Sequence, residues 1–261
     1  MNETAEILIR DLTDGVLTLK LNRPPVNAFN FELIAALRAA LKDAKRDHEV
    51  RCLLITGCGE TFSAGQDITV FEDLEDIPFR YHLKRTYNPL ILEIRRLEKP
   101  VIAAVNGPVS GAALGMALAC DLRIAADTAR FVVGFSRLGL APDSAVSLLL
   151  PALIGIGRAA EFAFTRSSIS AEQALAWGLV NRVAPAAEID DQAASWAAEL
   201  ADGPQRVIGL TKRAFNKAVL KDLEGILDYE AHLQEIAGHG AEHKEGVKAF
   251  LEKRWPDFQD R

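Results

Sequence analysis

Apolar residues follow two different periods along the first two thirds of the chain. In some places they alternate with polar residues or form short continuous runs, which is typical of β-strands. Between residues 31 and 45 they recur at helical spacing, which predicts a helix with one buried face. Because strands and helices alternate, the pattern predicts an α/β fold. Strands are expected at Ile7 to Ile9, Val16 to Leu21, Leu53 to Thr56, Val101 to Val105, Leu122 to Ala125 and Phe131 to Val133.

The segment between residues 69 and 99 has a different character. Its acidic part, Phe71 to Asp76, reads as a mobile lid, and a polar and aromatic helix from Phe79 to Leu97 is expected to follow, disturbed at Pro89. Further on, Ser170 and Gln173 have the spacing of a capping box, which predicts the start of a helix that ends near Gly178.

From about Ala186 onward the pattern is helical, and no strand signal follows Val183. A separate group of helices buries little surface by itself, so we expect it to pack against the core or against a neighbouring subunit. The expected organisation is therefore a core at residues 1–195 and a helical region at residues 196–261.

Composition limits the possible classes of function. The 261 residues are 49% hydrophobic and 25% charged, as in ordinary globular proteins, and the formal net charge of -6 disfavours binding to the nucleic-acid backbone. Three cysteines without paired spacing, and the lack of a signal peptide or transmembrane span, predict a cytoplasmic protein that does not act at a membrane. No metal site is expected, because His239 and His243 have the spacing of helix ligands but no supporting context.

Two glycine-containing corners carry the candidate chemistry. Residues 62–68 follow the strand at Leu53, and the glycine- and alanine-rich residues 106–121 follow the strand at Val101. Each corner offers backbone N–H groups beside a glycine, Gly65 or Gly111, so the two corners could hold one oxyanion that forms during a reaction. The alternative is that both glycines serve only tight turns and close helix packing.

With these corners the chain resembles the crotonase (enoyl-CoA hydratase/isomerase) superfamily. The resemblance covers nearly the whole chain and implies a spiral of ββα units with a C-terminal helical trimerisation region. It further implies an acyl-CoA thioester substrate, coenzyme A as part of that substrate with no permanently bound cofactor, and homotrimers or hexamers. By position, the family's donor amides belong to Gln66 and Ala112. Further motifs in family order are Leu21 to Pro24, Ala129 to Phe131, Leu138 to Asp143, Ala171 to Val180 and Glu245 to Arg254.

The chain departs from the hydratases of this family at both of their carboxylates, because Gly115 and Phe135 stand at those positions. The remaining acid is Asp143. It is either a proton carrier or a structural N-cap of the apolar helix that follows. An Asp in this context resembles the branch that isomerises ring-1,2-epoxyphenylacetyl-CoA, although that branch continues with two glycines where this chain has Ala145 and Val146.

The expected function is therefore acyl-CoA isomerisation through an enolate, with Asp143 moving the proton. Apolar neighbours, namely Phe135, Leu140 and Val146, should raise the pKa of Asp143 toward neutrality. Alternatives are a 2-enoyl-CoA hydratase and a non-catalytic acyl-CoA-binding protein. Residues that the resemblance places at the thioester, or that could line its pocket, are Arg23, Val26, Ala28, Ala64, Asp67, Ile68, Tyr87, Phe250 and Lys253, with the last two expected from a neighbouring subunit. Tyr87 could instead only anchor the lid helix, and Phe250 and Lys253 could be ordinary positions of an amphipathic helix.

Overall fold

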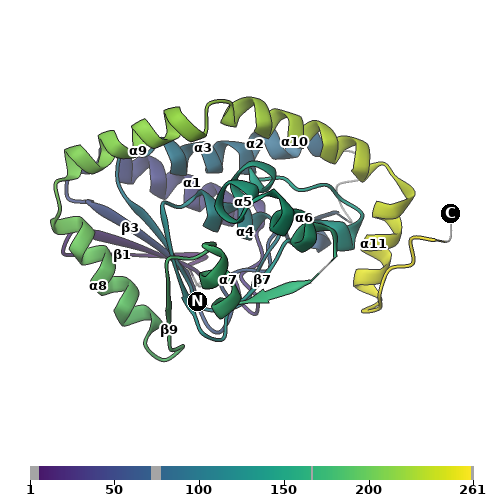
Figure 1. Ribbon diagram of the computed structural model, residues 1–261, viewed down its shortest axis with the longest axis horizontal. Helices are drawn as coiled ribbons and strands as arrows, with labels where there is room; N and C mark the ends of the chain where they lie inside the picture. Colours follow the sequence, from purple (N-terminus) through teal and green to yellow (C-terminus); the bar gives the residue numbers. More distant parts are fainter. Residues whose placement is uncertain (1–5, 72–77, 166, 260–261) are drawn as a thin grey trace, which may run out of the picture.

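Two β-sheets form the centre of the molecule. A computed structural model describes residues 6–71, 78–165 and 167–259 (Figure 1). The larger sheet has the order β1-β2-β3-β4-β6-β9, and the smaller one has the order β5-β7-β8. The larger sheet is parallel except for the β1–β2 hairpin. The strands are β1 Leu8–Thr13, β2 Val16–Leu21, β3 Cys52–Gly57, β4 Val101–Val105, β5 Val109–Ser110, β6 Leu122–Ala126, β7 Arg130–Val132, β8 Ser168–Ser170 and β9 Arg182–Ala184.

The chain winds through both sheets in repeated turns. Strand β4 of the larger sheet is followed at once by β5 of the smaller sheet, and β6 is followed in the same way by β7. After β3, Ser63 makes an isolated bridge to Val109 of β5, so the turn that begins with β3 repeats the pattern. In each of these turns of the spiral, the strands are followed by a helix. This arrangement confirms the expected α/β spiral of ββα units.

The strands form where the sequence predicts them. The predicted hairpin turns at Asp14 and Gly15, which both have positive φ (49° and 78°), as a two-residue hairpin turn of this kind requires. Strands β3 and β4 are buried on both faces, which explains their continuous apolar sequence. Three short strands, β5, β8 and β9, have no apolar run and were not expected.

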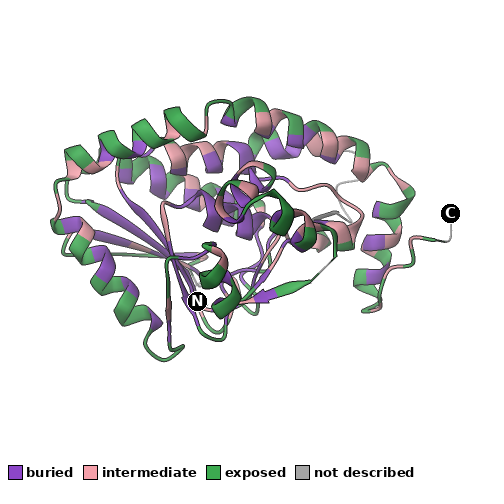
Figure 2. Cartoon of the chain, in the orientation of Figure 1, coloured by how far each residue is buried: buried purple, intermediate pink, exposed green. Residues whose placement is uncertain are grey.

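Helices cover the sheets, and their exposed residues lie on the sides that face outward (Figure 2). Helix α1 contacts β1, β2 and α3, whereas α8 contacts β2, β3, β4 and β6. Helix α4 is buried on every side, which accounts for its lack of charged residues. These helices are α1 Phe31–Arg46, α2 Phe79–Arg85, α3 Tyr87–Arg96, α4 Ala112–Ala119, α5 Val146–Ile154, α6 Ile156–Phe164, α7 Ala171–Trp177 and α8 Ile189–Asp202, with 3₁₀ turns η1 Ile68–Phe71 and η2 Phe135–Leu138.

The helix expected from Phe79 to Leu97 is broken, but at Thr86 rather than at Pro89. Proline has no N–H to donate to the residue four positions earlier, and its ring clashes with that carbonyl. The break therefore falls one turn ahead of Pro89. The freed carbonyl of Arg85 accepts a hydrogen bond from Arg38 Nη1 at 3.0 Å. The expected lid cannot be compared, because residues 72–77 lie outside the described residues.

Three helices follow the core and run along its edge (Figure 1). Helix α10 packs on α2, α3 and α5, and α11 packs on η2. Residue 195, where the sequence suggested the end of the core, lies inside α8, which continues to Asp202. These three helices are α9 Gln205–Val219, α10 Leu223–Gly238 and α11 Ala241–Leu251.

Candidate active site

The two glycine corners lie against each other. A Cβ atom on Gly65 would come within 2.6 Å of the carbonyl oxygen of Ser110 and 3.4 Å from the amide nitrogen of Ala112. Gly65 also has a φ of 87°, which side chains other than glycine rarely allow. The first corner therefore needs glycine in order to approach the second corner this closely.

Gln66 and Ala112 carry the backbone amides that were expected to bind an oxyanion. Gln66 and Ala112 line it together, and neither amide donates a hydrogen bond to a protein atom within the described part of the chain. Ala112 is also the first residue of α4, where the positive end of the helix dipole adds to the attraction for an anion. An oxyanion requires two donor amides that are directed at one point of such a cavity.

The cavity is mainly apolar and has a volume of about 290 Å³. Apolar and aromatic residues from α2, α3, β7 and η2 surround the two amides. Most of the residues that the sequence analysis named are among its lining residues, namely Val26, Ala28, Ala64, Gln66, Asp67, Ile68, Tyr87, Gly111, Ala112, Phe135, Asp143 and Phe250.

Asp143 lies at this cavity and is 7% exposed. Its Oδ1 accepts a hydrogen bond from Ser144 Oγ (2.7 Å) and its Oδ2 accepts one from Gln234 Nε2 (2.9 Å). Burial raises the pKa of Asp143 to about 6, although the bonds from Ser144 and Gln234 oppose the rise. A carboxyl group with this pKa can both accept and return a proton near neutral pH.

The alternative role of Asp143 as a helix N-cap is wrong. Helix α5 begins at Val146, its N-cap position is Ala145, and no side chain at that position caps it. The carboxylate of Asp143 instead accepts hydrogen bonds from Ser144 and Gln234. These bonds, and not a bond to α5, hold the carboxylate in place.

The loop from Asp143 to Ala145 explains the glycine at position 115. A Cβ atom on Gly115 would lie 2.5 Å from Ser144 Cβ and 2.6 Å from Ser144 O. Ser144 and Ala145 themselves have left-handed φ values of 55° and 62°. A glutamate at position 115 therefore cannot coexist with this loop.

Gln66 is fixed by its side chain as well as by its backbone. Its Oε1 accepts a hydrogen bond from the Tyr87 hydroxyl and lies 3.3 Å from His82 Nε2, and its Nε2 donates to Asp67 O. Because Oε1 can only accept, His82 carries its proton on Nε2. Burial lowers the pKa of His82 to about 4, so this imidazole is neutral.

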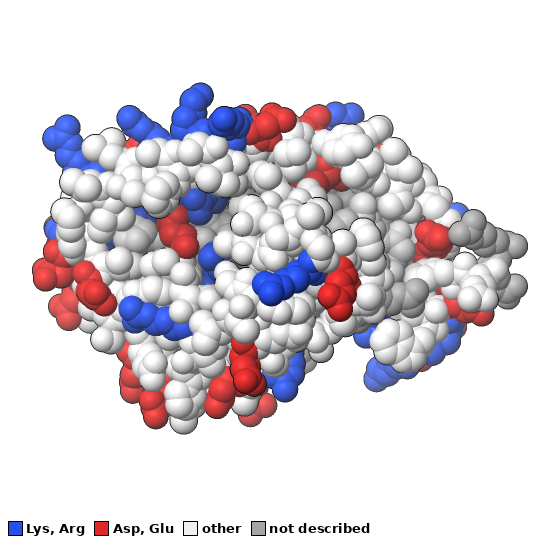
Figure 3. All heavy atoms as spheres, in the orientation of Figure 1, with Lys and Arg blue, Asp and Glu red and all other residues white. Residues whose placement is uncertain are grey.

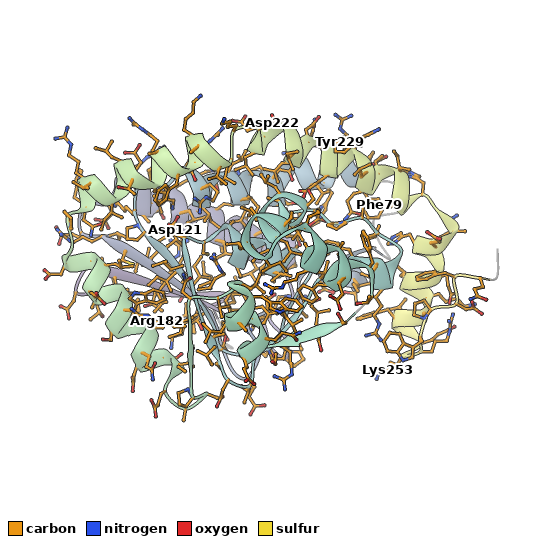
Figure 4. All side chains as sticks on the ribbon, in the orientation of Figure 1. Phe79, Asp121, Arg182, Asp222, Tyr229 and Lys253 are labelled. Atoms are coloured by element: carbon orange, nitrogen blue, oxygen red, sulfur yellow. The ribbon has the colours of Figure 1, made fainter. Side chains whose placement is uncertain are left out.

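Arg23 and Lys253 are not among the residues that line the cavity, whereas Phe250 is. Arg23 forms an ion pair with Asp67 (Nη2 to Oδ2, 2.6 Å), which places a cation beside the only other acid, Asp67, among the described residues that line the cavity. Phe250 lines the cavity of its own chain. Lys253 lies at the outer end of α11 (Figure 4) and is not a lining residue.

Two buried polar residues of α10 were missed by the sequence analysis. Gln234 lines the cavity, and Glu230 binds the start of α5 behind Asp143. They share the buried face of α10 with Leu223, Leu227 and Ala231. Polar residues on an otherwise apolar helical stripe are a signal that the sequence does contain.

Lysine and arginine side chains gather over α9 on the face shown in Figure 3, with acidic residues close by. In the residues that the structure describes, no group of three or more potential metal ligands comes together. His239 follows the end of α10 and His243 lies within α11, so the pair does not share one helix. Of the described helices, none has the length and apolar character that a membrane crossing requires.

A family model described as enoyl-CoA hydratase/isomerase matches residues 11–261. The chain belongs to this family. It is 42% identical over 257 residues to the 1,2-epoxyphenylacetyl-CoA isomerase of Escherichia coli strain K12, covering 97% of this chain and 98% of that protein. It is 37% identical to a probable enoyl-CoA hydratase of Rhodobacter capsulatus, covering 96% and 97% of the two chains.

Solved structures agree with this assignment. The crystal structure of an enoyl-CoA hydratase from Mycobacterium avium subsp. paratuberculosis K-10 superposes with a TM-score of 0.88 at 34% identity, covering 98% of this chain and 99% of the other. The chain is therefore an enzyme of the enoyl-CoA hydratase/isomerase family with the crotonase fold, and members of this family act on CoA thioesters.

Proposed function

We propose that the protein is an acyl-CoA isomerase that shifts a double bond or isomerises ring-1,2-epoxyphenylacetyl-CoA. One observation carries this proposal. Asp143, Gln66 and Ala112 line one cavity, while Gly115 and Phe135 stand where hydratases have carboxylates. The similarity to an epoxyphenylacetyl-CoA isomerase supports it.

One carboxylate is sufficient for such a reaction. Asp143 takes a proton from the carbon next to the thioester carbonyl, and the electron pair of that C–H bond forms an enolate. The oxygen of the enolate accepts hydrogen bonds from the Gln66 and Ala112 amides. Asp143 then returns the same proton to the far end of the conjugated system, so the double bond moves and no atom is gained or lost.

The rest of the substrate is coenzyme A, and the protein needs no permanently bound cofactor for this chemistry. We assign the path of coenzyme A to Val26, Ala28, Ala64, Asp67 and Ile68, which line one side of the cavity. Arg23, Phe250 and Lys253 are assigned to its outer part. Tyr87, Phe135 and Leu140 surround the acyl group beside Asp143.

The decisive experiment compares wild-type protein with Asp143→Asn on a 3-enoyl-CoA substrate, and follows the conjugated 2-enoyl product by absorbance. Wild type should turn over, and the variant should lose at least about 100-fold in kcat while it still binds the thioester. Asp222→Asn, an exposed acid at the start of α10, is the matched control. Full turnover by Asp143→Asn would remove Asp143 from the mechanism.

The second candidate function is hydration of 2-enoyl-CoA, which the similarity to a probable enoyl-CoA hydratase favours. Activating and protonating water uses two acid or base groups in the hydratases of this family, and here both positions lack a carboxylate. We therefore expect little or no hydration of crotonyl-CoA. Rapid hydration would favour the hydratase, and thioester binding without either reaction would favour a non-catalytic acyl-CoA-binding protein.

A further inference from the structure

Helix α10 presents two polar side chains to the loop that carries Asp143. Glu230 and Gln234 lie one turn apart on the buried face of this helix, and each is 1% exposed. Burying an ionisable group costs free energy unless hydrogen bonds replace its contacts with water. The hydrogen bonds of Glu230 therefore indicate its role in the folded protein.

Glu230 binds the start of α5. Its Oε2 accepts a hydrogen bond from the amide of Ala145 (2.8 Å), and its Oε1 accepts bonds from the amide (3.0 Å) and the hydroxyl (2.5 Å) of Ser147. The N-cap residue Ala145 has no side chain to do this. Glu230, 83 and 85 positions away in sequence from these partners, supplies the missing cap and places its negative charge at the positive end of the helix.

The loop held in this way has an unfavourable backbone. Ser144 and Ala145 are consecutive non-glycine residues with left-handed φ values of 55° and 62°. Such a conformation costs free energy at each residue and persists only where its surroundings enforce it. Glu230 holds the end of the loop, and Gln234 donates to Asp143 Oδ2 at its beginning.

We propose that Glu230 is a positioning residue, which keeps the Asp143 carboxyl group in its reactive place by holding the Ser144–Ala145 turn. Glu230 is not among the residues that line the cavity, so it acts through the loop and not on the substrate. This proposal rests on the proposed function, because it assumes that Asp143 moves the proton.

The electrostatic setting gives the proposal a specific readout. Asp143 is the charged group that acts on Glu230 through space, and Tyr87 on α3 faces Asp143, whereas His82 on α2 is neutral. Burial raises the pKa of Glu230 to about 7, and the charge of Asp143 adds to the rise. Asp143, with a pKa of about 6, ionises before Glu230 and its pKa is not raised by Glu230, so Glu230 acts on Asp143 through position and not through charge.

Glu230→Gln tests the proposal because it keeps the size of the side chain but loses one acceptor oxygen. We expect kcat on a 3-enoyl-CoA to fall by at least about tenfold, since small misplacement of a reacting group has large effects on rate. The Kd of a non-reacting saturated acyl-CoA should stay unchanged. The acidic limb of the kcat profile should keep its position, because Glu230 does not raise the pKa of Asp143.

Glu224→Gln is the matched control, because Glu224 lies on the same helix and pairs with exposed Arg96. If Glu230→Gln does not fold, Ser147→Ala removes one of the bonds to Glu230 from an exposed position and should lower kcat less, again at unchanged Kd. Wild-type kcat in the variant that folds, or a fall in kcat matched by a rise in Kd, would overturn the proposal. The proposed function fails separately, through turnover by Asp143→Asn.

Discussion

Asp143 combines burial with the hydrogen bonds that a reactive acid needs. Ser144 and Gln234 each bind one of its oxygens, and the apolar cavity around it keeps the proton bound to higher pH than usual. The residue is therefore ready for proton transfer at the expense of stability, because its ionised form is less favourable in the folded protein than in the unfolded chain.

Replacing Asp143 by Asn should stabilise the protein above neutral pH. The folded-state pKa of about 6 lies above the ordinary 3.8, so the wild type loses stability as pH rises from about 4 through about 6. The raised pKa corresponds to a gain of about 3 kcal/mol in the unfolding free energy of Asp143→Asn at pH 8, and to little gain at pH 4. Urea unfolding at both pH values measures it, with Asp222→Asn as control. An equal effect at both pH values would contradict the raised pKa.

Gly115 tests whether the loop of Asp143 needs a glycine on the facing helix. In Gly115→Ala, the new Cβ would meet Ser144 at 2.5 Å, so the loop must shift. We expect a loss of about 1–3 kcal/mol in unfolding free energy, together with a fall in kcat.

The control for this substitution is Gly157→Ala in helix α6, where nothing lies within 4 Å of the new Cβ. Alanine there should leave activity unchanged and stabilise the protein slightly, because it favours the helix. Equal effects of the two substitutions on unfolding would show that close packing at Gly115 is unimportant.

At the scale of elements, α11 closes the outer side of the cavity by direct contact with η2. Gly246 allows this contact, because a Cβ there would lie 2.5 Å from the carbonyl carbon of Leu138. His243 Nδ1 donates to Leu138 O at 2.9 Å, and the guanidinium of Arg137 lies 4.4 Å from the ring centre of Trp255. Phe250 of α11 and Leu138 of η2 then line the cavity together.

Gly246→Ala should separate α11 from η2 and weaken thioester binding. The backbone of η2 cannot yield to the new methyl group, so α11 must move and take Phe250 with it. We expect the Kd of a saturated acyl-CoA, measured by calorimetry, to rise by about tenfold, which matches an overpacking cost of about 1.4 kcal/mol. Gly157→Ala should leave the Kd unchanged, and an unchanged Kd in Gly246→Ala would place α11 outside the binding site.

At the scale of the whole molecule, the C-terminal helices leave apolar side chains in solvent. Phe215 on α9 is 64% exposed, and Val207, Val219, Tyr229 and Ile236 on α9 and α10 are also exposed. Apolar surface of this kind marks an interaction site in many proteins. Together with the family resemblance, it supports the proposal that the chain forms homotrimers or hexamers.

Phe215→Asp should weaken this self-association, because a charge would replace an apolar contact. Light scattering coupled to size exclusion should show a trimer or hexamer for wild type and smaller species for the variant at low micromolar concentration. The exposed Lys217→Glu on the same helix tests whether any added acid has this effect. A monomeric wild type would contradict the proposal.

Much of this site follows from local sequence. Apolar runs predict the strands before each corner, and the glycines at 65 and 111 predict the turns, because few other residues adopt their φ values. The missing acids at positions 115 and 135 and the candidate acid Asp143 can also be read directly from the chain. The sequence predicted the helix break at Pro89, three residues after its actual position at Thr86, because a proline affects the turn that precedes it.

The sequence by itself determined the strands, the corners and the chemical groups available for the reaction, since these depend on neighbouring residues and on the apolar period. Only the tertiary structure decided which groups meet. Helix α10 brings Glu230 and Gln234 to a loop more than 80 positions earlier. Gly115 of α4 approaches the same loop so closely that a Cβ atom there would meet Ser144. These contacts depend on how helices pack across the spiral, and local sequence patterns do not encode such long-range pairings.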